Sequence, residues 1–166
     1  SLNYIVNTKP YAPVRACHFL VQRGGTVQVV SAVGAYHAGK GGPWKFSRLV
    51  TIPKDQGNQH LYGIEIESRG TSPTISNDLG AINIRQVVST ALLSAALLDA
   101  MRPTWQSLPV TRVIRHRDWT PRKIDVLQDL DWWHQVIGIA RRNGKDSAKA
   151  EREIRAFVKA HPKGTL

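Results

Sequence analysis

Two residue classes are scarce in this sequence, and each scarcity excludes a kind of protein. Cys17 is the one cysteine among 166 residues, so an intrachain disulfide framework and a Cys-rich zinc module are both excluded. Acidic residues number 12 against 23 Lys and Arg, the net charge is +11, and the first carboxylate along the chain is Asp55. Such a charge favours binding to a polyanion, whether nucleic acid, an anionic membrane or an anionic cell-wall polymer.

Long hydrophobic runs are also missing. The longest apolar stretch, residues 87–101, is interrupted by Ser, Thr and Asp and is shorter than the roughly 20 residues that span a bilayer. Residues 1–9 lack the basic start and apolar run of a secretory signal. We therefore expect no transmembrane segment. The 42% of hydrophobic residues and 21% of charged residues are typical of a compact globular domain.

Strand and helix patterns alternate along the chain. Residues 17–22 and 27–31 are β-rich runs joined by a Gly-Gly turn, which predicts a hairpin. Residues 62–68 alternate apolar and polar side chains, which predicts a strand. Residues 110–114 are predicted to form a further short strand. Residues 45–58 and 115–126 are expected to be loops. Helices are predicted from about residue 76 to 101, over 129–142 and over 145–160. The sequence thus predicts an α/β fold with a central mixed β-sheet flanked by α-helices.

Two carboxylates lie two residues apart on the third predicted strand. Glu65 and Glu67 project from one face, while Tyr62, Ile64 and Ile66 project from the other. This pattern fits a half-buried strand with one solvated face. It also fits a carboxylate held on a rigid element, where it could act as a general base.

A cluster of polar residues, HRDWTPRKID over 116–125, follows the run at 110–114. Histidine and carboxylate ligands on a loop are what a zinc site needs. In extended backbone Lys123 and Asp125 share a face, which places an ammonium group beside a possible metal ligand. A solvated, charged loop is the alternative. His18 and His37 are equally open to a structural interpretation.

Four segments in order resemble one family. ACHFLVQRGGTVQVV (16–30), AYHAG (35–39), YGIEIE (62–67) and HRDWTPRKID (116–125) are similar to motifs of the zinc-dependent N-acetylmuramoyl-L-alanine amidases, which include phage endolysins and the peptidoglycan recognition proteins. The resemblance implies a central mixed sheet with helices on both sides. It also implies cleavage of the amide bond between the lactyl group of muramic acid and L-alanine.

The resemblance assigns roles to four of the polar residues. His116 and Asp125 match two of the family's zinc ligands, and Lys123 matches the lysine that stabilises the oxyanion. Glu65, the first carboxylate of the GIE motif, matches the general base.

Two further positions of the motifs depart from the family pattern. His37 matches the histidine that lines the substrate groove, although Tyr36 replaces the tryptophan that usually precedes it. Cys17 stands where some members have a catalytic tyrosine. A thiol cannot replace that phenol, so we expect Cys17 to be a small buried hydrophobic residue.

One zinc ligand is missing from the motifs. The family's first zinc histidine lies on an opening strand upstream of the ACHF segment, and no residue before Cys17 is a histidine. We expect that the chain lacks this first strand, because residues 1–9 resemble the helix that normally follows it. His18 or His37 could otherwise substitute as a ligand. The expected organisation is an N-terminally incomplete catalytic domain over 1–143 and a basic helical tail or linker over 144–166.

The predicted function is therefore zinc-dependent hydrolysis of bacterial peptidoglycan by part of a phage endolysin. Such a protein would be made in the host cytoplasm, act on the cell wall and be a monomer. The alternative is a catalytically inactive peptidoglycan-binding module of the same fold. Nucleic acid is not an expected partner, because no zinc finger, RNP aromatic pair or basic zipper is present. Residues 141–166 carry eight Lys and Arg against three acidic residues, which fits either a solvated helix or an arm that touches the wall.

Overall fold

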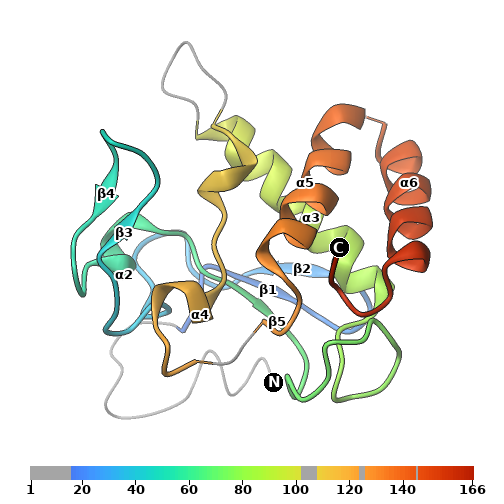
Figure 1. The fold of residues 1–166 in the computed structure, drawn as a ribbon, viewed down its shortest axis with the longest axis horizontal. Coiled ribbons are helices and arrows are strands. Elements are labelled where there is room, and N and C mark those ends of the chain that lie inside the picture. Colours follow the sequence, from blue (N-terminus) through green and yellow to red (C-terminus); the bar gives the residue numbers. More distant parts are fainter. Residues whose placement is uncertain (1–15, 102–107, 124–125, 145) are drawn as a thin grey trace.

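The computed structural model describes residues 16–101, 108–123, 126–144 and 146–166 (Figure 1). A small mixed sheet lies at the centre of the molecule. Three long helices lie on one side of the view, and a two-stranded hairpin with two short helices lies on the other. This arrangement confirms the predicted mixed α/β fold.

The central sheet has three strands in the order β2-β1-β5. Strands β1 (Phe19–Val21) and β2 (Val27–Val29) are antiparallel and form the predicted hairpin. Gly25 occupies its turn at a φ of +89°, a conformation that favours glycine. Strand β5 (Ile64–Ile66) pairs in parallel with β1, so that Glu65 lies opposite Leu20.

Helix α3 (Ile84–Ala100) crosses the sheet and is joined to it by polar contacts. Asn83 begins the helix with a capping box, in which its side chain accepts the Gln86 N–H and the Gln86 side chain accepts the Asn83 N–H. The Gln86 amide also donates to the Glu67 carbonyl at 2.8 Å. The prediction of a helix start near residue 76 is wrong, because the capping box at Asn83 sets the start and residues 76–82 form turns.

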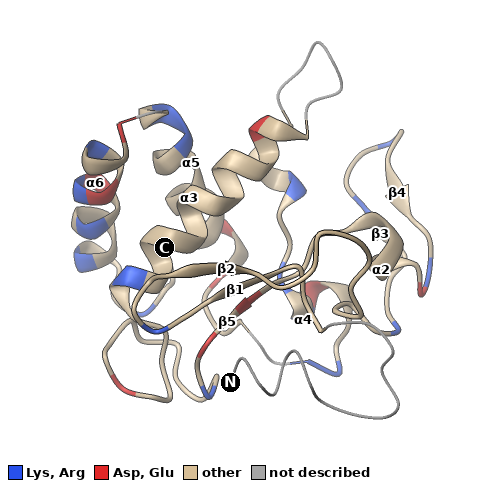
Figure 2. Ribbon diagram, turned by 180° about the vertical axis from the view of Figure 1, so that it is seen from behind, with Lys and Arg blue, Asp and Glu red and all other residues tan. Residues whose placement is uncertain are grey.

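Helices α5 (Leu130–Asn143) and α6 (Ser147–Ala160) pack with α3 around the main hydrophobic core. Helix α6 begins two residues after the predicted start at 145, and the Asp146 side chain caps it by accepting a hydrogen bond from the Lys149 N–H. Its buried side chains, Ala150, Ile154 and Val158, follow an i, i+4, i+8 pattern. Figure 2 shows Lys and Arg on the outer side of α6 and carboxylates along β5. No helix among the described residues is long and apolar enough to cross a membrane.

Three segments differ from the sequence predictions. The run at 110–114 is a short 3-10 helix, η1 (Val110–Arg112), followed by extended backbone, and it is not the predicted strand. The backbone is extended at Val113 and Arg115, but no described strand lies beside it to form a ladder. The expected loop at 45–58 contains strand β4 (Thr51–Ile52) and the start of helix α2 (Gly57–His60), and strand β3 (Trp44–Lys45) pairs with β4. The expected loop at 115–126 begins with helix α4 (His116–Trp119).

Candidate active site

Two histidines from different motifs pack against the start of β5. His18 Nδ1 accepts the Gly63 N–H at 3.0 Å, and His37 Nε2 donates to the Leu61 carbonyl at 2.8 Å. The two imidazole centroids are 5.1 Å apart. A Cβ atom on Gly63 would overlap the His37 ring. The glycine of the YGIEIE motif is therefore required by the close approach of His37, a role that the sequence analysis did not assign.

Burial keeps both imidazoles neutral near pH 7. Burial, together with the neighbouring His18 and His116, lowers the pKa of His37 to about 4, while the hydrogen bond to the Leu61 carbonyl opposes the shift. Burial also lowers the pKa of His18, against a hydrogen bond with the backbone of Val33. His37 thus offers the site a neutral imidazole and not a cation.

His116 lies at the first position of α4, and a local network fixes that helix. The Asp118 carboxylate accepts the Arg115 backbone N–H at 2.9 Å, and it also accepts the Arg115 Nε and Nη2 groups. The Arg115 Nη1 group donates to the Gln128 carbonyl at 2.8 Å. The bidentate Arg115–Asp118 pair holds the first turn of α4 in place. The bond from Arg115 Nη1 to Gln128 connects this turn to the chain that precedes α5. Arg115 precedes the motif and was not predicted to have a role.

Helix α4 also packs onto the glycine-rich segment that carries His37. His116 Nε2 lies 3.2 Å from the Ala38 carbonyl, and since a carbonyl can only accept, Nε2 carries the proton. Trp119 is buried with Ala38 and Ile52, and its carbonyl accepts the Gly42 N–H at 2.8 Å. The AYHAG and HRDW motifs are therefore one packed unit.

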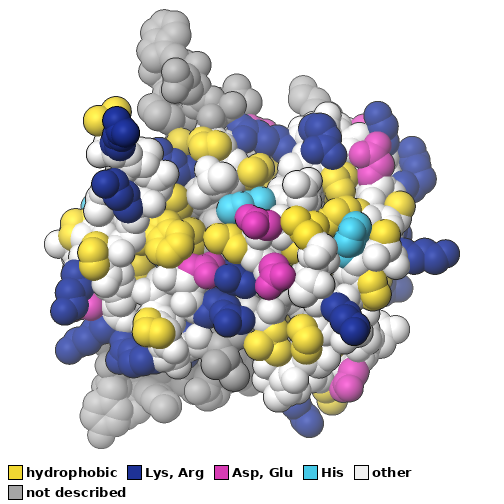
Figure 3. All heavy atoms as spheres, in the orientation of Figure 1, with side chains coloured by type: hydrophobic (Ala, Val, Ile, Leu, Met, Phe, Trp, Pro, Cys, Tyr) yellow, Lys and Arg dark blue, Asp and Glu magenta, His cyan; other side chains and the backbone are white. Residues whose placement is uncertain are grey.

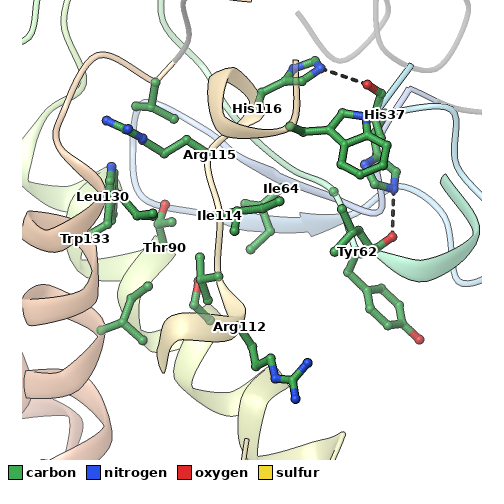
Figure 4. A pocket seen from close by; sticks show the side chains of 18 of the residues that line it. His37, Tyr62, Ile64, Thr90, Arg112, Ile114, Arg115, His116, Leu130 and Trp133 are labelled. Atoms are coloured by element: carbon green, nitrogen blue, oxygen red, sulfur yellow. Dashed lines mark hydrogen bonds between the residues drawn. The ribbon is translucent and has the colours of Figure 1, made fainter. Parts of the chain in front are cut away.

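These contacts form a small pocket of about 280 Å³ that brings three predicted site residues together. It is lined by Tyr36, His37, Ala38, Gly39, His116, Thr120, Arg122 and Lys123. A larger cavity of about 460 Å³ shares His37, Ala38 and His116 with this pocket, and Glu65 lines it. Figure 4 shows His37 and His116 at one end of the larger cavity. His37 and His116 therefore line both cavities, whereas Lys123 lines the smaller one and Glu65 lines the larger one.

The two carboxylates of β5 have different surroundings. Both are half-buried, so the strand does not have a freely solvated face. One Glu67 oxygen accepts the Arg23 backbone N–H at 3.0 Å and so holds the β1–β2 turn. Glu65 lies close enough to Cys17 to raise the pKa of that thiol. Glu67 thus has a structural role, whereas Glu65 borders the cavity.

Cys17 is fully buried with Leu20 and Val30. Burial, with the nearby Glu65 carboxylate, raises the pKa of its thiol to about 12. Cys17 therefore remains protonated and inaccessible, as expected for a small buried hydrophobic residue.

The described residues do not by themselves form a zinc site. His116 is the expected ligand that the structure describes, and Asp125 lies outside the described residues. His18 and His37 are engaged with the backbone at Gly63 and Leu61. No group of three or more His, Cys, Asp or Glu side chains within the described ranges is placed to hold a metal ion.

The fold and the pocket define a mixed α/β domain whose polar residues converge beside the edge of a small sheet. Residues 3–126 match the family model described as N-acetylmuramoyl-L-alanine amidase. The chain therefore belongs to this family, which places it among the hydrolases that act on the amide bonds of peptidoglycan. Searches of curated proteins and of solved structures gave no match.

Proposed function

We propose that the protein hydrolyses the amide bond between N-acetylmuramic acid and L-alanine in bacterial peptidoglycan. The observation that carries this proposal is the pocket that His37, His116 and Lys123 line together. His37 and Lys123 belong to different motifs and are 86 positions apart in the sequence. Family membership supports the reaction class, and convergence of the motif residues supports an active centre in this chain.

The chain's own residues can perform the proton transfers of amide hydrolysis. Glu65 is proposed to accept a proton from the attacking water and to pass it to the leaving amine. The Lys123 ammonium group is proposed to stabilise the developing oxyanion, an interaction typically worth about 3–4 kcal/mol for one donor. His37, which is neutral, is proposed to hydrogen-bond the substrate in the groove.

Zinc is proposed as the cofactor, held by His116 and Asp125 with a further donor from outside the described residues. When bound, zinc supplies a Lewis acid that lowers the pKa of a water ligand toward about 7. Equilibrium dialysis with elemental analysis should show zinc bound by the parent chain and at least tenfold weaker binding by His116→Ala. His134→Gln is the matched control, because His134 lies on α5 and lines neither cavity. Equal zinc binding by the parent and His116→Ala would contradict this assignment.

The cellular setting is proposed to be cell-wall lysis by a phage endolysin, made in the host cytoplasm and acting on the wall as a monomer. The net charge of +11 supports attraction to an anionic wall. Figure 3 shows Lys and Arg side chains spread over one face and most numerous toward its edges, with carboxylates among them. Binding to isolated walls should therefore weaken steeply as the salt concentration rises.

Product analysis tests the proposed reaction. Purified peptidoglycan is incubated with the protein, and the soluble products are identified by mass spectrometry. Intact glycan strands together with peptides that begin with a free L-alanine amino group are the expected result. Shortened glycan strands would contradict the proposal.

A peptidoglycan-binding module without catalysis is the second candidate. The observation that favours it is the incomplete metal ligand set among the described residues. This candidate predicts that the protein co-sediments with peptidoglycan but releases no product, even with zinc added. Release of L-alanine peptides would exclude it.

A further inference from the structure

The β3–β4 hairpin extends from the side of the molecule opposite the three long helices (Figure 1). Its base is fixed to helix α4. Ile52 of β4 is buried with Trp119 of α4, and Trp44 of β3 packs against the same cluster. The Gly42 N–H, two residues before β3, donates to the Trp119 carbonyl at 2.8 Å. The base of the hairpin is therefore anchored, and its other end projects from the fold.

The end of the hairpin carries an apolar side chain that the fold does not bury. Leu49 is 95% exposed, more than any other large hydrophobic residue among those that the structure describes. It lines neither cavity, whereas the neighbouring Val50 lines the larger one. The turn is defined by the Phe46 N–H, which donates to the Val50 carbonyl at 3.0 Å, and by the Leu49 N–H, which donates to Ser47 Oγ at 3.3 Å. Single exposed leucines are common on protein surfaces, so the meaning of this one depends on its surroundings.

The charged residues of the hairpin are all basic. Lys45, Arg48 and Lys54 are exposed, and the sequence has no Asp or Glu before residue 55. Within the part of the chain that the structure describes, none of these three cations forms an ion pair. Figure 2 shows Lys and Arg along the hairpin. Figure 3 shows hydrophobic and basic side chains together at its end. Apolar and cationic groups are therefore presented to solvent on one projection.

We propose that the end of the β3–β4 hairpin docks on the surface of an anionic phospholipid bilayer. The three cations contact the lipid phosphates, and Leu49 enters the boundary between the headgroups and the acyl chains. Wall polymers and nucleic acids also attract cations, but a hydrophilic polyanion does not take a leucine side chain out of water. A bilayer does both, and membrane association commonly needs two such contributions. The inference concerns binding and does not depend on the proposed amidase activity.

A polarity-sensitive fluorophore at residue 49 tests the contact directly. Leu49→Cys is labelled with a thiol-reactive nitrobenzoxadiazole dye, and the native Cys17 does not compete because it is fully buried. Leu79→Cys is the matched control, because Leu79 is also exposed, at 55%, but lies in the turns before α3. The probes are vesicles of phosphatidylcholine alone and of equal parts phosphatidylcholine and phosphatidylglycerol. With the anionic vesicles only, emission from residue 49 should shift to shorter wavelength, and emission from residue 79 should not.

Two double variants show whether the hairpin or the overall charge is responsible. Lys45→Gln with Arg48→Gln changes the hairpin, and Arg152→Gln with Lys159→Gln changes two exposed positions of α6. Each pair removes two positive charges from the net charge of +11. Circular dichroism first confirms that both proteins are folded. In vesicle sedimentation, the hairpin pair should weaken binding to anionic vesicles at least about tenfold. The α6 pair should weaken it less than about threefold, because charges beyond a Debye length from the docked surface are screened.

Leu49→Ser distinguishes a bilayer from a wall polymer. Loss of the apolar side chain should weaken binding to anionic vesicles at least about fivefold. Binding to isolated, lipid-free cell walls should stay unchanged, because a hydrophilic polymer does not bury the leucine. Leu79→Ser, made at the exposed position before α3, should change neither.

Four results would overturn the proposal. The first is unchanged emission from residue 49 when anionic vesicles are added. The second is an equal loss of vesicle binding for the two double variants, which would mean that only the net charge matters. The third is that Leu49→Ser weakens wall binding as much as vesicle binding, which would make a wall component the occupant. The fourth is short-wavelength emission from residue 49 without vesicles, which would show that the chain itself or a second copy covers the hairpin end.

Discussion

Acidification should destabilise the folded protein through His37. Its pKa is about 4 in the folded state against 6.5 for an ordinary histidine, so the unfolded chain binds a proton between these pH values and the folded chain does not. Stability therefore falls as the pH drops from about 6.5 to 4. The full shift corresponds to roughly 3 kcal/mol. Because the ring is only partly buried, we expect about 2 kcal/mol after allowing for solvent screening.

Urea denaturation at a series of pH values from 7.5 to 4 measures this contribution, with His37→Gln as the reference. Carboxylates and the other histidines titrate in both proteins, so the difference between the two curves isolates residue 37. The parent should lose about 2 kcal/mol more unfolding free energy than the variant across this range. Parallel curves, or a larger loss in the variant, would refute a buried neutral imidazole at this position. A neutral His37 also implies that this side chain does not attract anionic groups of the substrate.

Three further predictions concern packing. Gly63→Ala should destabilise the fold by about 1–3 kcal/mol in urea titrations and move the His37 ring resonances, because the new methyl group overlaps that ring; unchanged resonances would contradict the contact. The Cys17 thiol should not react with an aromatic disulfide reagent at pH 8 until urea unfolds the protein, because it is fully buried and its pKa is about 12; rapid labelling of the native protein would show that it is accessible. Ile154→Ala should cost about 2–5 kcal/mol on urea unfolding, because Ile154 is fully buried between α6 and the core. Arg152 is exposed on the same helix, so Arg152→Ala should change the unfolding free energy by less than about 0.5 kcal/mol. Equal losses of stability for Ile154→Ala and Arg152→Ala would mean that α6 does not contribute to the core.

Elements whose stabilising contacts are local in sequence could be predicted. The β1–β2 hairpin follows from its Gly-Gly turn, and α6 lies within the helix predicted over 145–160, with its cap at Asp146. The start of α3 was misplaced because several residues near 76–78 can cap a helix, and only the capping box between Asn83 and Gln86 decides among them. The run at 110–114 was predicted wrongly because its structure depends on contacts that are distant in sequence. Its composition suits a strand, but a strand also needs a neighbour, and this depends on the rest of the fold.

The candidate site was predictable in part. Its motifs named His37, His116 and Lys123, and the structure brings these residues to one pocket. The positions of Asp125 and of residues 1–15 lie outside the described residues, so the predicted zinc ligand set and the predicted helix at 1–9 stay predictions. The alternation of Glu65 and Glu67 could not show which carboxylate is structural, because the distinction comes from the N–H group of Arg23, which lies 44 positions before Glu67.

That distinction allows the most direct test of the proposed chemistry. The measurement is the rate at which free L-alanine amino groups appear when purified peptidoglycan is treated with the parent, Glu65→Gln and Glu67→Gln. A residue that moves a proton in the reaction typically contributes about 10²–10⁴-fold to the rate. We therefore predict a loss of at least about 100-fold for Glu65→Gln. Glu67→Gln should keep most of the activity, since its amide oxygen can still accept the Arg23 N–H. Equal rates for the parent and Glu65→Gln, in preparations shown to be folded, would contradict the account.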